Sequence, residues 1–429
     1  MHTDCSSSQE SLSLIDPIER FSLGPSGRVI TRSIQRRSGG KSHTRVSLDD
    51  RVPASVDEDG LAALFDQATL RSRDIPKSFG KGANVRSVDL FSGAGLLSLG
   101  AMQACHALGI GFDPILAIDA APIAARAYAA NFPTCNVVSG DIVELIDGRL
   151  GTEHSESESQ LRKQLGRIDL LLGGPPCQGH SDLNNHTRRD DPKNRLYDRM
   201  ARFAEIVRPT NIVIENVPAV RHDRRGVVGV VVDHLQELGY RTFSGVVRLA
   251  DLGVPQSRSR HVVVASLTSG AAIADCLQSM RRPWRSTTWA IGDLKSVPRT
   301  DIYDTASVPT VKNRNRIDYL FSNRTYDLPD RFRPDCHKLK AHSYRSMYGR
   351  LKPNEPAQTI TSGYGSMGQG RFVHPTQRRM ITPHEAARLQ LIPDSFNLRH
   401  IEKRTALAEV IGNAVPPKLA YVLALDLLR

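Results

Sequence analysis

The sequence predicts an α/β fold built on an open, largely parallel sheet, because short apolar segments recur along the chain and each stops abruptly. Residues 85–91 run into a Ser-Gly-Ala-Gly loop, residues 168–172 stop at Gly-Gly-Pro-Pro, and residues 211–214 stop at Glu215. Short segments that are apolar throughout are typical of strands buried on both faces. The polar groups that end them should gather at one edge of the sheet, where open α/β sheets bind their ligands.

The first of these strands predicts a binding site for an adenosine ligand. It is followed by Gly93 and Gly95, which allow close approach to the backbone, and by a helix whose N-terminus favours a carboxylate or phosphate. A Gly-x-Gly pair alone is more often a structural turn. The next strand, residues 115–118, ends at Asp119, where a carboxylate can bond ribose hydroxyls, and residues 137–142 again contain an aspartate, Asp141. These residues do not separate a dinucleotide from S-adenosylmethionine.

The loop after residues 168–172 presents a cysteine, Cys177, directly after two prolines. Proline restricts the backbone and removes donors, so the thiol is held in one direction. A thiolate is a strong nucleophile towards carbon, and the carboxyl group of Glu215, at the end of the next strand, could protonate a ring nitrogen and activate an aromatic base. A lone cysteine is often just a buried thiol, and Glu215 could be a surface charge. The Pro-Pro-Cys-Gln context favours a nucleophile and its acid.

Composition restricts the class of protein. The 429 residues allow a large core and predict two folded parts, and the formal net charge of +12 suggests a polyanionic partner. Six scattered cysteines argue against a disulfide framework, and Cys336-His337 lacks the partners of a zinc site, so no metal is expected. We find no apolar segment long enough to span a membrane and no signal peptide, so we expect a cytoplasmic protein.

Changes in composition divide the chain into four parts. Residues 1–84 are rich in Ser, Arg and Asp and predict a poorly ordered extension with one short helix near residues 61–65. Residues 85–265 form the predicted catalytic and cofactor-binding domain. In residues 266–377 the α/β pattern lapses and arginine, aromatic and turn residues dominate, which suits contacts to phosphates and base edges. Residues 378–429, with helices expected from Pro383 and over 418–428, should return to the catalytic domain.

Several motifs, in one order, resemble those of the DNA (cytosine-5) methyltransferases. They are Asp89-Leu90-Phe91-Ser92-Gly93-Ala94-Gly95, Pro176-Cys177-Gln178, Glu215-Asn216-Val217, Gln256-Ser257-Arg258-Ser259-Arg260 and Gly412-Asn413-Ala414-Val415. The resemblance extends from about Val85 to the C-terminus. It implies a Rossmann-like methyltransferase sheet that binds S-adenosylmethionine, with residues 266–377 as a smaller, irregular target-recognition domain.

The resemblance also implies roles for individual residues. Phe91 would stack on adenine, Asp119 would hold the ribose, Asp141 and Ile142 would frame the base, and Gly93 and Gly95 would leave room for the methionine part. Pro176, Asn413 and Val415 would complete that pocket. Ser181, Gln256, Thr359 and Ile360 are the residues expected at the DNA, the last two from a Thr-aliphatic element before a glycine-rich recognition loop.

In the implied mechanism, the Cys177 thiolate adds to C6 of cytosine while Glu215 protonates or bonds N3. Arg260, together with Arg258, would steady the O2 oxygen and the nucleophile loop, since a guanidinium keeps its charge. The target carbon lies inside the stacked duplex, so the base must be swung out, and a polar loop from Ser181 to residue 189 could close over it. That loop could equally be an ordinary solvated one.

The main hypothesis is a monomeric enzyme that methylates cytosine C5 in a short duplex DNA sequence, as the modification half of a restriction-modification pair whose endonuclease would be encoded elsewhere. One alternative is the tRNA-methylating branch of the family, although the large region after Arg260 favours DNA. Another is a non-catalytic DNA-binding relative, which would have no need of Cys177, Glu215 and Asp119 together. Amino-methylating enzymes place an aromatic residue after a similar Pro-Pro turn, where this chain has Cys177.

Overall fold

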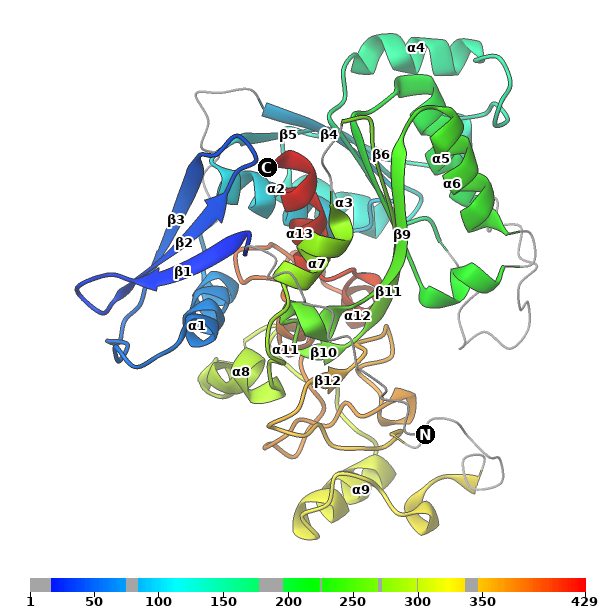
Figure 1. The fold of residues 1–429 in the computed structure, drawn as a ribbon. Helices are drawn as coiled ribbons and strands as arrows, with labels where there is room; N and C mark the ends of the chain where they lie inside the picture. Colours follow the sequence, from blue (N-terminus) through cyan, green and yellow to red (C-terminus); the bar gives the residue numbers. More distant parts are fainter. Residues whose placement is uncertain are drawn as a thin grey trace, which may run out of the picture.

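The centre of the protein is a seven-stranded sheet with the order β6-β5-β4-β7-β8-β11-β9 (Figure 1). The computed structural model describes residues 17–74, 84–176, 196–223, 226–268, 272–298, 300–335 and 346–429. The strands are β4 (Asn84–Leu90), β5 (Gly111–Asp119), β6 (Asn136–Ser139), β7 (Leu170–Gly173), β8 (Asn211–Asn216), β9 (Arg241–Arg248) and β11 (Ser259–Ser266). The first five in chain order pair in parallel, and β11 pairs antiparallel with β8 and β9. The predicted open α/β sheet is confirmed.

The order of the strands reverses beside β4. From β4 the chain builds outward through β5 and β6 on one side, and then through β7 and β8 on the other. The crevice at such a reversal, at the carboxyl ends of the strands, is where open α/β sheets bind ligands. Here it lies between the ends of β4 and β7, which are followed by the glycine loop and by the loop towards Cys177.

Helices bury the sheet on both faces, which explains why its strands are apolar at successive positions. Leu170, Leu172 and Val213 pack with α2 (Leu96–Leu108), α7 (Ile273–Ser279) and α13 (Pro417–Leu428). The alternating residues, such as Leu171 and Ile212, face the helices α4 (Glu156–Leu165), α5 (Tyr197–Val207) and α6 (Val227–Glu237). Because successive side chains of a strand point to opposite faces, each strand contributes residues to both apolar cores. Helix α3 (Pro122–Asn131) lies against β5 and β6.

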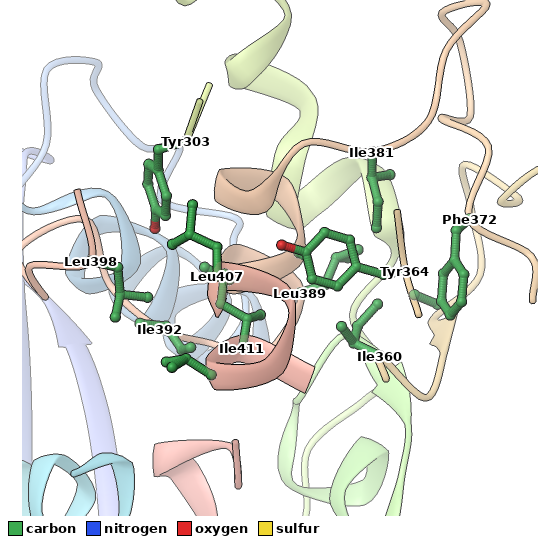
Figure 2. Packing of buried hydrophobic residues seen from close by; sticks show 14 of the residues in the cluster. Tyr303, Ile360, Tyr364, Phe372, Ile381, Leu389, Ile392, Leu398, Leu407 and Ile411 are labelled. Carbon is green, nitrogen blue, oxygen red and sulfur yellow. The ribbon is translucent and has the colours of Figure 1, made fainter. Parts of the chain in front are cut away.

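The region after β11 contains little regular structure. Its described elements are α8 (Thr287–Ile291), η5 (Gly292–Ser296), α9 (Val311–Ser322), η6 (Asp330–Phe332), β12 (Ala357–Gln358) and η7 (Met367–Gln369). Tyr364 and Phe372 of this region share an apolar cluster with Leu389, Leu407 and Ile411 of the C-terminal segment (Figure 2). The C-terminal segment therefore supports the recognition region through α11 (Pro383–Leu389) and α12 (Arg404–Asn413), and rejoins the catalytic core through α13.

One boundary differs from the predicted one. Helix α7 begins at Ile273, inside the segment assigned to recognition, yet Ile273, Cys276 and Met280 are buried in the core beneath the catalytic sheet. The irregular region predicted to recognise DNA therefore starts after α7. The short helices and strands of that region still pack together as one cluster.

The prediction of a poorly ordered N-terminal extension is wrong for residues 17–71. Strands β1 (Glu19–Leu23), β2 (Val29–Gln35) and β3 (Lys41–Ser47) form an antiparallel sheet of their own, followed by α1 (Glu58–Arg71) (Figure 1). The inner face of this sheet buries Glu19, Arg32 and Ser42 beside its apolar residues. Because these polar residues occupy inward positions, the period-two pattern is hard to see in the sequence.

The last two helices bear on the expectation that no segment spans a membrane. Taken together, α12 and α13 (Arg404–Leu428) are long and apolar enough by composition to cross a membrane. However, 89% of their most apolar window is buried inside the protein, where α13 packs against α2. A core helix explains this composition.

Candidate active site

Glu215 and Arg260 meet at the end of the sheet. Glu215 ends β8 next to Asn216, and its register partner in β11 is Val262, two residues from Arg260, so both side chains leave the same face. The Nε atom of Arg260 lies 2.5 Å from Oε1 of Glu215. Glu215 is only 6% exposed, and burial raises its pKa although Arg260 and Arg258 act to lower it. A carboxyl group with a raised pKa is suited to hold a proton and pass it to a base.

The loop that leads to Cys177 is fixed beside this carboxyl group. The N–H of Gly174 donates to the carbonyl oxygen of Leu90 at 3.3 Å, and Nδ2 of Asn216 donates to the carbonyl oxygen of Pro175 at 3.2 Å. A Cβ atom on Gly174 would lie 3.4 Å from Oε2 of Glu215. The backbone therefore passes the acid at close range just before Cys177. Cys177 and Ser181 themselves lie outside the described residues.

Arg258 has a different surrounding from Arg260. Its Nη1 donates to the carbonyl oxygen of Ile360 at 2.8 Å, and both terminal nitrogens approach the carbonyl oxygen of Gly412 at 3.5 Å. Burial lowers the pKa of Arg258, and the neighbouring Arg260 acts in the same direction. The structure therefore places Arg258 between the recognition region and α12, where it positions backbone, so the predicted direct catalytic role does not fit.

The prediction that Gln256 and Ile360 contact DNA is wrong, since both are fully buried at 0% exposure. The side chain of Gln256 donates to Leu389 O at 3.0 Å and to Gln390 Oε1 at 3.1 Å, and accepts from Ile360 N at 3.1 Å. The backbone of β10 (Gln256–Ser257) pairs with β12, and the Gln256 side chain adds the bonds to Ile360 and to α11. The amide group of Gln256 thus makes its hydrogen bonds inside the protein. Thr359 is half-buried, and its hydroxyl donates to Ser257 O at 3.1 Å.

The loop after β4 forms an open cradle. Phe91, Gly93 and Gly95 all have positive φ angles, of 56°, 55° and 91°. A Cβ atom on Gly93 would meet nothing within 4 Å, whereas one on Gly95 would lie 2.7 Å from the ring of Tyr128. Gly95 is therefore required by packing, and Gly93 borders open space. Phe91 is half-buried beside it.

Asp119 braces this cradle. Its Oδ2 accepts the N–H of Gly93 at 2.7 Å and its Oδ1 accepts the N–H of Ala121 at 2.8 Å. A carboxylate has about four acceptor positions, so it can still bond ribose hydroxyls. The buried hydroxyl of Ser92 has no hydrogen-bond partner among the described residues. An open space with unused polar groups fits a nucleoside-type ligand.

The other predicted cofactor residues lie in varied surroundings. Asp141 caps η1 (Ile142–Glu144) by accepting the N–H of Val143 at 3.1 Å, and Ile142 is buried in the core under the sheet. Pro176 is half-buried. Asn413, exposed at the end of α12, and the half-buried Val415 precede α13. The backbone at Gly412 is so close to Thr361 and Ser362 that any Cβ atom there would collide with them.

Sequence reasoning missed a buried acid beneath the cradle. Asp89 is 1% exposed; its Oδ2 accepts the hydroxyl of Ser98 at 2.7 Å, and its Oδ1 has no partner among the described residues. Burial, assisted by the charge of Asp119, raises the pKa of Asp89 to about 7 although Ser98 opposes the shift. Nothing in the sequence distinguishes Asp89 from an acid at an exposed strand end.

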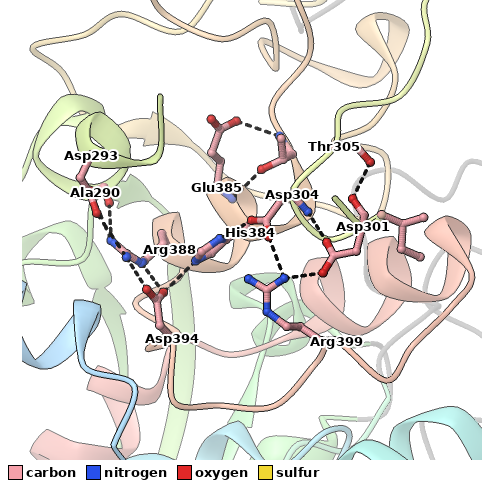
Figure 3. Close-up of polar contacts among 12 residues, drawn as sticks. Ala290, Asp293, Asp301, Asp304, Thr305, His384, Glu385, Arg388, Asp394 and Arg399 are labelled. Carbon is pink, nitrogen blue, oxygen red and sulfur yellow. Dashed lines mark hydrogen bonds and ion pairs between the residues drawn. The ribbon is translucent and has the colours of Figure 1, made fainter. Parts of the chain in front are cut away.

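Sequence reasoning also missed a polar network that joins the recognition region to the C-terminal segment (Figure 3). Both ring nitrogens of His384 face carboxylates, with Nδ1 2.7 Å from Asp304 Oδ1 and Nε2 2.8 Å from Asp394 Oδ1. Arg399 reaches Asp304 Oδ2 at 2.7 Å, and Arg388 binds Asp394 through two nitrogens. Although burial alone would raise it, His384 and Arg388 lower the pKa of Asp394 to about 2. These ion pairs and hydrogen bonds hold the predicted recognition region against the C-terminal segment.

Comparisons with known proteins agree with this geometry. The model of the C-5 cytosine-specific DNA methylases matches residues 85–429. The chain belongs to this family. It is 42% identical to the Type II methyltransferase M1.BsuMI of Bacillus subtilis over 98% of each chain, and 28% identical to M1.HphI of Haemophilus parahaemolyticus over 80% of this chain and 86% of that protein. This chain is thus a DNA cytosine-5 methyltransferase, similar to Type II modification enzymes.

Solved structures support the fold. A putative DNA modification methyltransferase encoded within an Escherichia coli prophage has a TM-score of 0.54 at 23% identity, covering 80% of this chain and 98% of that one. The Dnmt2 methyltransferase of Schizosaccharomyces pombe (S. pombe) has a TM-score of 0.53 at 18% identity, with the same coverage. At these identities the likeness shows a shared methyltransferase fold alone.

Proposed function

We propose that this enzyme methylates C5 of cytosine within a specific duplex DNA sequence, through a covalent bond between Cys177 and C6 of a base that has been turned out of the helix. The observation that carries the proposal is the buried pair of Glu215 and Arg260, beside the loop that leads to Cys177. A protein that only binds DNA has no use for a carboxyl group with a raised pKa at that place.

The residues divide the reaction between them. The Cys177 sulfur forms a bond to C6 while Glu215 donates its proton or a hydrogen bond to N3, which moves the electron pair of the C5–C6 double bond to C5. Arg260 donates to the developing charge on O2 and orients Glu215. The C5 carbon would take the methyl group as the methyl–sulfur bond of the donor breaks and the sulfur leaves as a neutral thioether. A base then removes the C5 proton, the Cys177–C6 bond breaks as the C5–C6 double bond re-forms, and N3 returns any proton it took to Glu215. Cys177, Glu215 and Arg260 can act on the base only after it has turned out of the stacked duplex.

The methyl donor of this proposal is S-adenosylmethionine, which supplies an electrophilic methyl group on a sulfonium. The cradle of Phe91, Gly93 and Asp119 fits its adenosine part, because Gly93 borders open space and Asp119 keeps acceptor capacity. Asn413 and Val415 would close the same pocket from the C-terminal side. The cradle lies at the strand reversal beside β4, adjacent to the loop that leads to Cys177.

The relatives suggest the biological setting. M1.BsuMI and M1.HphI are named as Type II methyltransferases. We therefore infer that this enzyme protects a target sequence from a cognate endonuclease encoded elsewhere. We also propose that it acts as a monomer in the cytoplasm.

The test is a covalent trap. The purified protein is incubated with labelled S-adenosylmethionine and duplexes that carry 5-fluorocytosine in many sequence contexts, beside Cys177→Ser and Glu215→Gln. Fluorine at C5 cannot leave as a proton does, so the wild-type enzyme should remain bound to DNA after denaturation. Cys177→Ser should form no adduct, and Glu215→Gln should form it about 10²–10⁴-fold more slowly. An adduct on RNA instead of DNA would move the substrate to tRNA, and none on either would favour a binding protein.

A further inference from the structure

The small N-terminal sheet has two faces of opposite character. Its register pairs Arg20 with Ser33 and His43, and Ser22 with Thr31 and Arg45, so these rows share one face. The other face carries Glu19, Arg32 and Ser42 with the apolar residues, and it is buried. One face therefore packs on the protein and the other points to solvent.

The outward face consists almost entirely of hydrogen-bond donors and cations. Its residues are Arg20, Ser22, Val29, Thr31, Ser33, Gln35, Lys41, His43, Arg45 and Ser47. We call this set the basic face. It contains no carboxylate; Asp49 and Asp50 follow β3 in sequence, and Glu58 of α1 pairs with Arg20 at 3.1 Å. Lys41 and Arg45 are exposed and form no ion pair within the described part of the chain.

The charge of this sheet is not balanced locally. Residues 18–48 contain seven Lys and Arg residues against one acid, Glu19, and so carry half of the net charge of +12 in 31 residues. Glu19 lies on the buried face, where its Oε2 pairs with Arg282 at 2.9 Å and its Oε1 accepts the hydroxyl of Tyr421 at 2.6 Å. Its charge is used inside the protein and does not offset the basic face.

The sheet is attached firmly to the catalytic core. The hydroxyl of Ser42 donates to Ala107 O in α2 at 2.7 Å, and Arg37 pairs with Asp426 of α13 at 2.8 Å. The family model begins only at residue 85, whereas the similarity to M1.BsuMI covers 98% of both chains and so includes this sheet. The basic face is thus an addition to the methylase domain, held in a fixed position on it.

We propose that the basic face is a second DNA-contacting surface, which binds phosphates of duplex DNA outside the target site. Lys41 and Arg45 lie four residues apart on one strand, roughly 13 Å, which matches a major groove about 12 Å wide and lets them reach phosphates on both of its sides. Ser22 and Thr31 supply the hydroxyl donors that often accompany such contacts. A protein partner fits poorly, because Val29 is the single apolar residue on the face and aromatic residues are absent from it.

The choice of duplex DNA as the partner rests on the proposed function, but the surface is tested by binding alone. Affinity for a 40-base-pair duplex of arbitrary sequence is measured by fluorescence anisotropy across a series of salt concentrations. The variant is Lys41→Gln/Arg45→Gln. The matched control is Arg162→Gln/Lys163→Gln on α4, which removes the same charge from exposed positions. Helix α4 covers the opposite face of the seven-stranded sheet from the N-terminal sheet.

Each lost phosphate contact should reduce the slope of log K against log salt by about 0.9, so the slope of the double variant should fall by roughly 1.8 and its binding at 0.1 M salt should weaken by on the order of 60-fold. The control should keep the wild-type slope, and both proteins should keep the wild-type kcat at saturating DNA. Equal slopes for variant and control would overturn the proposal. A slope change with single-stranded RNA but not with duplex DNA would overturn the choice of partner. Failure of the wild type to methylate any DNA would instead contradict the proposed function.

Discussion

Replacing Asp89 by asparagine should flatten the pH dependence of stability, because this acid is buried with one unpaired oxygen. Its pKa is raised from 3.8 to about 7 in the folded protein. A raised folded pKa means that the protonated acid is favoured in the native state, so its contribution to stability is complete below pH 3.8 and is lost as pH rises through 7. For these two pKa values the loss between pH 5 and pH 8 is about 2.6 kcal/mol.

The measurement is urea denaturation of wild type, Asp89→Asn and the control Asp233→Asn at half-unit steps from pH 5 to pH 8.5. Asp233 is exposed on α6, so its replacement should leave the curve parallel to that of wild type. Asp89→Asn is expected to be less stable than wild type at pH 5, because an amide donor is left unsatisfied, and to gain on it by about 2–3 kcal/mol at pH 8. A constant difference between Asp89→Asn and wild type at every pH would refute the reasoning.

Two further substitutions test how the parts are joined. Gly412→Ala would drive a methyl group into the backbone at Ser362, so we expect a loss of DNA and cofactor binding together, measured by calorimetry; unchanged affinities would show that the loop can move aside. Glu19→Gln leaves Arg32 and Arg282 without their buried counter-charge and should cost about 3–5 kcal/mol in urea denaturation, whereas the exposed Arg20→Ala should cost under about 1 kcal/mol. Equal costs would refute this.

The catalytic sheet was predictable from the sequence because its pattern is unambiguous. Residues 168–172 and 211–214 are apolar at successive positions, and the structure buries both faces of β7 and β8 under helices. The N-terminal sheet was not predictable for the opposite reason. Its inward positions include Glu19 and Arg32, which pair with each other and also depend on residues remote in sequence: Arg282 pairs with Glu19, and the Tyr421 hydroxyl hydrogen-bonds to both. Such compensation is tertiary and leaves no local signal.

The candidate site was predictable where chemistry follows the strand ends. The structure brings Glu215 and Arg260 together and places the glycine loop against Asp119, while the catalytic roles themselves stay predictions. Motif reasoning failed at Gln256 and Ile360, because a motif records that a residue type is needed and does not say whether it faces DNA or the interior. Both are buried in contact with each other through the Ile360 N–H.

The buried contacts of Gln256 show how the two regions of the enzyme are connected. The Gln256 side chain binds Ile360, just after β12, and Leu389 of α11 at once, and Arg258, two residues later, holds the carbonyl groups of Ile360 and Gly412. Arg260 follows after another two residues and reaches Glu215. Alternate positions of the segment that joins β10 to β11 therefore contact the recognition region, the C-terminal segment and the acid in turn. A shift of the recognition region on binding DNA must act on this segment, so we expect the position of Glu215 to depend on how the recognition region is seated.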